Sequence, residues 1–376
     1  MVGLYSTPEE CWFYAHIDKN VKSVVVEDDI NKKGKPRALN YGLKLATGKV
    51  ITVLDAEDIV AKDSFIRAAY MMQKKDYQVV QGVLDLVNES DGWKNLMMRA
   101  EYGYWYSTYL KALKRSNYPL PLGGTTNFFK KEVLEKLGGW NSNNLTEDFE
   151  LGMGIYAYNS RIKENLKKNK DPNKVDAFKK DMIKVGVIKS VTEEESPVTV
   201  NGWMRQRTRW QQGKIQTLRD YRRGDKDLDL KTRAIIFFSS MQPHLSIINL
   251  TGLGISIYAY FDKALSLPVE ILAGFNALMV GFYATMNSLS YLKVTKDQKE
   301  TIKYRHLKAV IAGVTLPAYW AMQWAADIKA FKLEYVNKSN EWYKTEHFGR
   351  HLNDTQLDDI IKEAAVQPTT NITKNK

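Results

Sequence analysis

Residues 49–58 read Lys-Val-Ile-Thr-Val-Leu-Asp-Ala-Glu-Asp, a short apolar run followed at once by acidic side chains. A run of this length rich in β-branched residues predicts a buried β-strand. Asp55, Glu57 and Asp58 then follow the carboxyl end of that strand. Open α/β sheets bind their ligands beyond the carboxyl ends of their strands. The stretch therefore predicts a sheet with a polar ligand site at that edge.

The neighbouring segments extend this pattern in both directions. Apolar runs at residues 23–26 and 77–83 predict further strands. A helix is expected between the first two strands, because Pro36 lies near its start and Gly48 follows its apolar face. A second helix over residues 64–74 completes an alternation typical of a parallel α/β sheet. Two more helical features follow, an aromatic-rich helix over 93–114 and a charged insertion at about 161–186 that favours a helical hairpin.

The acidic turn after residue 54 has two interpretations. Asp55 and Glu57 are oxygen donors of the kind that holds a hard divalent cation, and such a cation can bridge a diphosphate. The turn can instead be structural, with Asp58 or Asp63 capping the helix that follows.

Two later segments also have both a structural and a functional interpretation. In Leu145-Thr146-Glu147-Asp148, Thr146 can cap a helix, or one carboxylate can serve as a general base. In residues 203–210, arginine can clamp a diphosphate and tryptophan can offer a flat face to a sugar ring. A basic helix at a membrane surface has much the same composition.

Five motifs follow one another in order along the chain. They are Gly34-Lys35-Pro36-Arg37-Ala38-Leu39-Asn40, Asp55-Ala56-Glu57-Asp58, Gly123-Gly124-Thr125-Thr126-Asn127, Thr146-Glu147-Asp148 and Gln206-Arg207-Thr208-Arg209-Trp210. Together they resemble the successive motifs of family 2 glycosyltransferases, most closely the cellulose-synthase-like, membrane-bound branch. The likeness resumes at Trp342-Tyr343-Lys344-Thr345-Glu346-His347, which is similar to a WxKTxH signature of related bacterial enzymes.

The resemblance implies an α/β fold of the GT-A type, a mixed sheet flanked by helices, with a nucleoside-diphosphate sugar as donor. It also implies a Mg or Mn ion and inversion at the anomeric carbon. Asp148 matches the general base, and Asp55 and Glu57 match the element that binds metal and donor, with Glu57 standing where Asp is commoner. Lys35 and Arg209 match further donor-binding residues, and the acceptor-binding positions are Gly124, Thr125, Glu147, Gln206 and Trp210.

The amino-terminal end departs from the family pattern. Members begin with two strands, the second ending in a nucleotide-binding Asp, and nothing before Ser23 is expected to supply them. Residues 7–16 are similar to the helix that follows that Asp. We therefore expect a catalytic domain over 1–225 that lacks its first strand, and a partner chain that completes the sheet is one alternative.

The composition changes after residue 226. Residues 234–261 hold no charged side chain apart from any charge on His244, and residues 269–292 hold only Glu270. Each is long enough to cross about 30 Å of hydrocarbon. A buried all-helical subdomain is the alternative, because both segments contain several polar residues. Lysine and arginine cluster after residue 292, as the positive-inside rule requires of a cytosolic loop.

We therefore expect a membrane region over residues 226–330 with two transmembrane helices, 234–261 and 269–292. A third apolar stretch, 309–327, is expected to be interfacial or re-entrant, since an even number of crossings keeps the 331–376 tail in the cytosol with the catalytic domain.

Charge and cysteine content narrow the function classes. The net charge is +12, from 55 Lys and Arg against 43 Asp and Glu, and the basic residues flank apolar stretches. This placement favours a membrane surface over nucleic acid. The single cysteine, Cys11, excludes an intramolecular disulfide.

The sequence thus predicts a multi-pass membrane enzyme that moves a hexose from a UDP-sugar to a polysaccharide or lipid-linked acceptor at the cytosolic face. The alternative is an inactive or split-enzyme membrane subunit.

Overall fold

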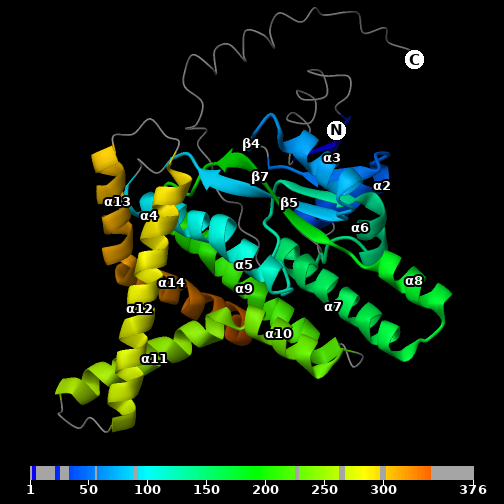
Figure 1. The fold of residues 1–376 in the computed structure, drawn as a ribbon. Helices are drawn as coiled ribbons and strands as arrows, with labels where there is room; N and C mark the ends of the chain where they lie inside the picture. Colours follow the sequence, from blue (N-terminus) through cyan, green and yellow to red (C-terminus); the bar gives the residue numbers. More distant parts are fainter. Residues whose placement is uncertain are drawn as a thin grey trace, which may run out of the picture.

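The computed structural model describes residues 2–5, 22–25, 34–55, 57–88, 92–224, 228–261, 267–296 and 302–339. Its centre is a five-stranded sheet (Figure 1). In spatial order the strands are β3 (Val50–Val53), β6 (Asn127–Lys130), β5 (Val79–Leu86), β7 (Val185–Glu194) and β4 (Ile59–Val60). Only β5 and β7 pair in parallel, and the other neighbours are antiparallel.

The order of the strands corrects the expected parallel alternation. We expected β3 and β5 to belong to a parallel sheet, but β6 lies between them and runs antiparallel to both. Residues 127–130 come from a segment that the strand and helix pattern had not marked. The mixed sheet flanked by helices fits the expected GT-A fold. β3, β5 and β7 run in the same direction, so their carboxyl ends still lie at one edge.

A further strand precedes Ser23. Strand β1 (Val2–Tyr5) pairs in parallel with β2 (Lys22–Val25) in a separate two-stranded sheet. The expectation that no strand comes before Ser23 was therefore wrong. Four residues that include Gly3 are too few to show a strand pattern. No Asp lies within β1, and the helix expected at residues 7–16 falls outside the described residues.

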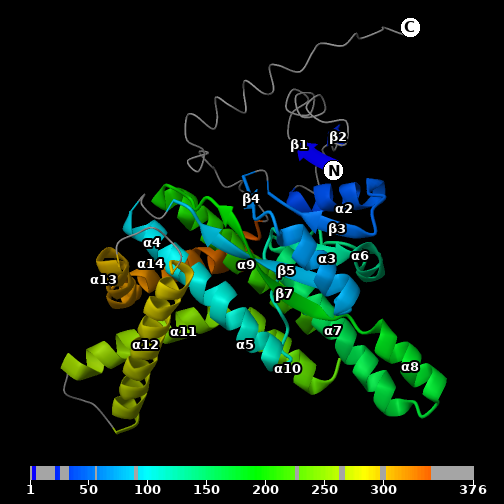
Figure 2. The ribbon, with the colours of Figure 1, turned by 45° about the horizontal axis from the view of Figure 1, so that its top comes forward.

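Helices cover both faces of the sheet. Ala68 and Met72 of α3 (Ser64–Lys74) pack with Val80 and Phe128 on one face. On the other face, Val79 and Phe129 contact apolar residues of three helices (Figure 2). These are α2 (Lys35–Leu45), α6 (Lys131–Leu137) and α7 (Glu147–Lys168). The charged segment after residue 161 forms the end of α7 and then α8 (Pro172–Asp181), a projecting helical hairpin.

The aromatic-rich segment is not a single α-helix. It divides into α4 (Trp93–Tyr104), a π-helical turn η2 (Trp105–Tyr109) and α5 (Leu110–Arg115). Tyr104 and Tyr109 stack with ring centroids 6.2 Å apart, a pairing at the i, i+5 spacing that a π turn brings together. The wider π-helical turn places the side chains of Tyr106 and Ser107 in the interior.

The carboxyl-terminal half is helical. It comprises α9 (Val200–Gly224), α10 (Leu230–Ser240), α11 (Gln242–Phe261), α12 (Leu267–Val294), α13 (Ile302–Val314), α14 (Leu316–Phe331) and a π-helical turn η3 (Lys332–Asn337). Figures 1 and 2 show α11 and α12 projecting from the sheet-bearing part. Within the described residues, α12 is the one helix both long and apolar enough to cross a membrane.

Two helix boundaries differ from the expectation. Residues 234–261 form two helices that meet at Met241, because Pro243 cannot continue the backbone hydrogen bonding of α10. Residues 309–327 likewise divide at Thr315, two residues before Pro317. The segment 269–292 lies within α12 as expected.

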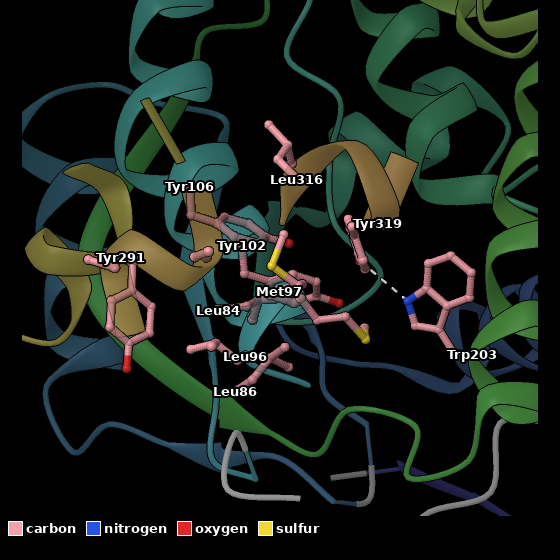
Figure 3. Close-up of a cluster of buried hydrophobic side chains, with 14 of the residues drawn as sticks. Leu84, Leu86, Leu96, Met97, Tyr102, Tyr106, Trp203, Tyr291, Leu316 and Tyr319 are labelled. Atoms are coloured by element: carbon pink, nitrogen blue, oxygen red, sulfur yellow. Dashed lines mark hydrogen bonds between the residues drawn. The ribbon is translucent and has the colours of Figure 1, made fainter. Parts of the chain in front are cut away.

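The two halves share one apolar core. It joins Leu84 and Leu86 of β5 to Met97 of α4, Trp203 of α9 and Tyr291 of α12, all buried (Figure 3). Leu316 and Tyr319 of α14 belong to the same cluster, in which Trp203 Nε1 donates to the Tyr319 hydroxyl at 3.3 Å. The helical region is therefore part of the same folded unit as the ligand-binding edge.

Candidate active site

Lys35 joins three of the sequence motifs. It is the first residue of α2, and its ammonium group forms an ion pair with Asp55, which follows β3. The same Nζ donates to the carbonyl oxygen of Gly124 at 2.9 Å. Both charged side chains remain partly exposed, 25% for Lys35 and 35% for Asp55. A ligand can therefore reach this ion pair.

Asp58 holds the acidic turn in shape. Its Oδ2 accepts the Asp55 N–H at 2.7 Å and the Thr125 hydroxyl. Burial raises the pKa of Asp58 to about 6, although these two hydrogen bonds lower it, and the nearby charges of Asp55 and Glu57 raise it further. Asp58 thus has a structural role in the turn, but the expected helix cap is not formed, because Asp63 precedes α3 and its side chain makes no capping hydrogen bond. Thr125, expected at the acceptor, has its hydroxyl on this turn.

Gln81 of β5 fixes the loop at Gly123 and Gly124. Its Oε1 accepts the Gly123 N–H at 2.8 Å, and its Nε2 donates to the Thr125 carbonyl at 3.1 Å. Thr126 then has a positive φ of 53°, which a β-branched residue rarely adopts. Such a conformation persists because the surrounding hydrogen bonds hold it, so the loop is rigid where it meets Lys35.

The two acids of the Thr-Glu-Asp motif lie at the start of α7. Glu147 is buried and Asp148 half-buried. A Cβ atom placed on Gly124 would lie 3.5 Å from Asp148 Oδ2 and 3.6 Å from Lys35 Nζ. The carboxylate of Asp148, the ammonium of Lys35 and the backbone of Gly124 therefore surround one small space. Thr146 precedes the helix, but its side chain makes no capping hydrogen bond.

Burial has the largest effect on the pKa of both Glu147 and Asp148. Burial raises the pKa of Glu147 to about 7, with a further increase from the charge of Asp148. It also raises the pKa of Asp148. The cations Lys35 and Arg209 act in the opposite direction on both groups. A carboxylate with a raised pKa holds a proton more readily, as a general base must.

Helix α9 supplies the last motif. Arg209 Nη1 donates to the carbonyl oxygen of Leu145 at 3.3 Å, which places this side chain beside the loop before Asp148. Gln206 is buried, and its Oε1 has no hydrogen-bond partner within the described part of the chain; the same is true of Nε of Arg209. Unpaired buried polar atoms are costly, and a bound ligand would satisfy them. Trp210 is half-buried on the same turn.

Sequence reasoning missed the partners of Arg207. This buried guanidinium is paired with Glu101 at 2.6 Å and lies over the Trp210 ring, 4.6 Å from its centroid. The Tyr319 hydroxyl completes the group by donating to Glu101 at 2.7 Å. The position of Trp210 thus depends on α4 and α14. No local spacing could have indicated this, since both partners lie more than 100 residues away.

Glu194 and Tyr106 were also missed. Burial raises the pKa of Glu194, at the end of β7, to about 8, and Asp58, Asp55 and Glu57 raise it further against a hydrogen bond from Tyr102. Tyr106 approaches from η2, and its hydroxyl would lie 2.5 Å from a Cβ on Gly123. The acidic run at residues 193–195 was the one available signal for Glu194.

The acidic groups fit a divalent cation in part. No set of three Asp, Glu, His or Cys side chains among the described residues is arranged to hold a metal ion. Mg²⁺ in nucleotide sites, however, commonly takes one or two carboxylates, with water and phosphate oxygens as its other ligands. Asp55 and Glu57 are carboxylates of the kind that could supply such ligands, and their negative charges raise the pKa of Asp58 and Glu194.

Comparison with known proteins identifies the family. The sequence profile of the family described as "Glycosyltransferase like family 2" matches residues 11–213, which cover more than half of the chain and all five motifs. The chain belongs to this family. The glycosyltransferase resembles a probable glycosyltransferase, YdaM, of Bacillus subtilis, with 24% identity over 88% of this chain and 74% of that protein.

Two further relatives have more specific names. A β-monoglucosyldiacylglycerol synthase of Trichormus variabilis is 26% identical over 53% of this glycosyltransferase, and the match spans only 37% of the synthase. A poly-β-1,6-N-acetyl-D-glucosamine synthase of Staphylococcus epidermidis is 25% identical over 54% of this chain and 44% of the synthase. Among solved structures, a mannosyltransferase of Pyrobaculum calidifontis in complex with GDP-Man and Mn²⁺ covers 90% of this chain and 78% of its own, at 19% identity and a TM-score of 0.49.

Proposed function

We propose that this glycosyltransferase moves a hexose from a UDP-sugar to a polysaccharide or lipid-linked acceptor at the cytosolic membrane face, with inversion. The observation that carries the proposal is the meeting of Lys35, Asp55 and Asp148 around Gly124. A cationic group for a diphosphate and a base of raised pKa lie on either side of one glycine. Glycosyl transfer needs a cation near the leaving diphosphate and a base near the acceptor hydroxyl.

The chemistry is a single displacement. Asp148 accepts the proton of the acceptor hydroxyl, whose oxygen attacks the anomeric carbon while the bond from that carbon to the diphosphate breaks. Lys35 and Arg209 offset the negative charge of the leaving UDP. The attack comes from the face opposite the leaving group, so the anomeric configuration inverts without a covalent enzyme intermediate.

Other residues bind the substrates. Asp55 and Glu57 would hold Mg²⁺ or Mn²⁺, which when bound supplies positive charge to the donor diphosphate. Gln206 and Trp210 face the acceptor, with the unpaired Gln206 oxygen available to a sugar hydroxyl. Gly124, Thr125 and Glu147 form the remainder of the acceptor side. The names of the two synthase relatives support a saccharide or lipid acceptor.

The helical region supports the proposed membrane location. α12 carries exposed Leu278 and Phe275, and its last turn packs on α4, where Val294 lies against Gly103. We propose that α12 crosses the bilayer and that α11, which meets it, forms the second crossing. The domain limits 1–225, 226–330 and 331–376 remain part of this proposal, and the Trp342 to His347 motif lies outside the described residues.

The test is UDP release by membranes that contain the chain, with Mg²⁺ or Mn²⁺ and a panel of UDP-sugars. Asp148→Asn should reduce kcat by about 100-fold or more, because general bases contribute about 10² to 10⁴ in rate. Asp176→Asn, on the exposed face of α8, is the matched control and should leave turnover unchanged. No turnover with any donor would support the alternative of a subunit that needs a partner chain.

A further inference from the structure

A buried carboxylate near the carboxyl-terminal end of the described chain contacts α9. Glu334 lies in η3, directly after α14, and its side chain is 4% exposed. Its Oε2 accepts from Gln212 Nε2 at 3.2 Å and from Gln216 Nε2 at 3.1 Å. Its Oε1 forms an ion pair with Arg219. Three successive turns of α9 therefore donate to one carboxylate.

Gln216 connects this carboxylate to the Asp148 loop. While its Nε2 donates to Glu334, its Oε1 accepts the Leu145 N–H at 2.9 Å. An ionised carboxylate is only an acceptor, so the amide must turn its NH₂ group towards Glu334. The amide oxygen then has to point at Leu145. The charge of Glu334 thus determines which way Gln216 faces and gives the Leu145 N–H its acceptor.

The rest of the loop is held by the same helix. Arg209 donates to the Leu145 carbonyl, and Asn144 Nδ2 donates to the Thr217 hydroxyl at 2.9 Å. The Thr146 N–H donates in turn to Asn144 Oδ1 at 2.9 Å. Helix α7 begins at Glu147, and Asp148 is its second residue. Hydrogen bonds from α9 thus hold the backbone of residues 144–146, which leads directly into the first turn of α7 with Asp148.

We propose that Glu334 is a positioning residue for Asp148 and acts through the Gln216 amide. The proposal rests on the proposed function, since it takes Asp148 to be the base. It makes the packing of η3 and α14 on α9 a condition for an active base. Small displacements of a catalytic group are costly, up to about 100-fold in rate for about 1 Å.

The first test is Glu334→Gln in the full chain. The new amide can donate as well as accept, so Gln216 can turn over and the Leu145 N–H loses its acceptor. We expect kcat to fall by about 10-fold to 100-fold, with the KM for the UDP-sugar changed by less than about twofold. Lys332→Gln, at an exposed position of the same turn, is the control and should behave as the wild type.

A double-mutant cycle tests whether Glu334 acts on Asp148 through Gln216. Gln216→Leu removes the connecting amide, and Glu334→Gln added to it should cause little further loss if Glu334 acts through Gln216. Additive losses would show that Glu334 acts by another path and would overturn the proposal. Hydrogen exchange gives a second readout, because the Leu145 amide should exchange faster in Glu334→Gln and not in Lys332→Gln.

The outcomes separate the two proposals. Turnover that is abolished by Asp148→Asn but unchanged by Glu334→Gln would overturn the positioning role alone. An inactive wild type would overturn the proposed function and with it the role of Glu334 towards a base. If, in addition, Glu334→Gln left the hydrogen-exchange rate of the Leu145 amide unchanged, Glu334 would not stabilise the loop at all.

Discussion

Lys35 occupies an unusual position among the charged residues of the site. Burial disfavours its ammonium group, yet its pKa is raised because Asp55, Glu147 and Asp148 surround it. The same charge lowers the pKa of Glu147 and Asp148, while burial raises both and dominates. Glu147 therefore binds a proton near neutral pH, and the pKa of Asp148 lies above its ordinary value. A base of this kind can both take a proton and be regenerated.

The pH dependence of turnover should show how much Lys35 lowers the pKa of Asp148 and Glu147 against the effect of burial. Lys35→Met removes the cation that favours the ionised carboxylates, so the pKa of Asp148 and Glu147 should rise. Since the base acts only when ionised, the acid limb of kcat should move to higher pH. The measurement is kcat against pH at saturating UDP-sugar, so that weaker donor binding does not enter. Lys74→Met, on the exposed face of α3, is the control, and an unmoved limb would contradict the account.

At the scale of elements, α9 organises the site. One face carries Gln206, Arg209 and Trp210, and the following turns bind the loop of residues 144–146. Gly213 allows the close approach, because a Cβ there would overlap the Thr146 hydroxyl and lie 2.7 Å from its backbone nitrogen. Glycine is otherwise unfavourable inside a helix, so its presence here reflects packing.

Gly213→Ala should therefore displace the loop. The added methyl group meets backbone, which cannot move aside cheaply, and we expect a loss of about 1 to 3 kcal/mol in the free energy of unfolding. Thermal unfolding in detergent and UDP release would both be measured. Gly254→Ala in α11, where nothing lies within 4 Å of the added atom, is the control. Equal thermal stability of the two variants would show that the loop does not depend on this contact.

The sequence predicted the motif residues of α9 but neither the extent of this helix nor what orients those residues. Strand β3, helices α2 and α3 and the segment 269–292 follow from local patterns of apolar residues, prolines and glycines. The placement of β6 between β3 and β5 depends on pairing between Val50 and Lys130, which no local pattern contains. The same holds for Arg207, whose burial is set by Glu101 and Tyr319 on distant elements.

On the scale of the whole molecule, apolar side chains are unevenly distributed. Large hydrophobic residues are exposed along α11, α12 and α13, among them Ile257, Tyr258, Leu278 and Leu307. Exposed apolar surface of this kind marks contact with a membrane or with another protein. The other end of α12 is buried in the core through Tyr291, beside Tyr102 and Tyr106 of the site region. A bilayer around α12 would thus hold the site close to the membrane face, where a lipid-linked acceptor could reach it.

A charge placed in the middle of α12 tests this arrangement. Leu278 is 72% exposed, and Leu278→Arg would place a cation near the bilayer centre if α12 spans it. Insertion scales set this cost at about 2.5 to 3.5 kcal/mol. We expect less of the variant in alkaline-washed membranes than of the wild type. Leu230→Arg, at the 84% exposed start of α10, is the control and should stay in the membrane. If both variants were retained equally, α12 would not span the bilayer, and its exposed face would need another apolar partner.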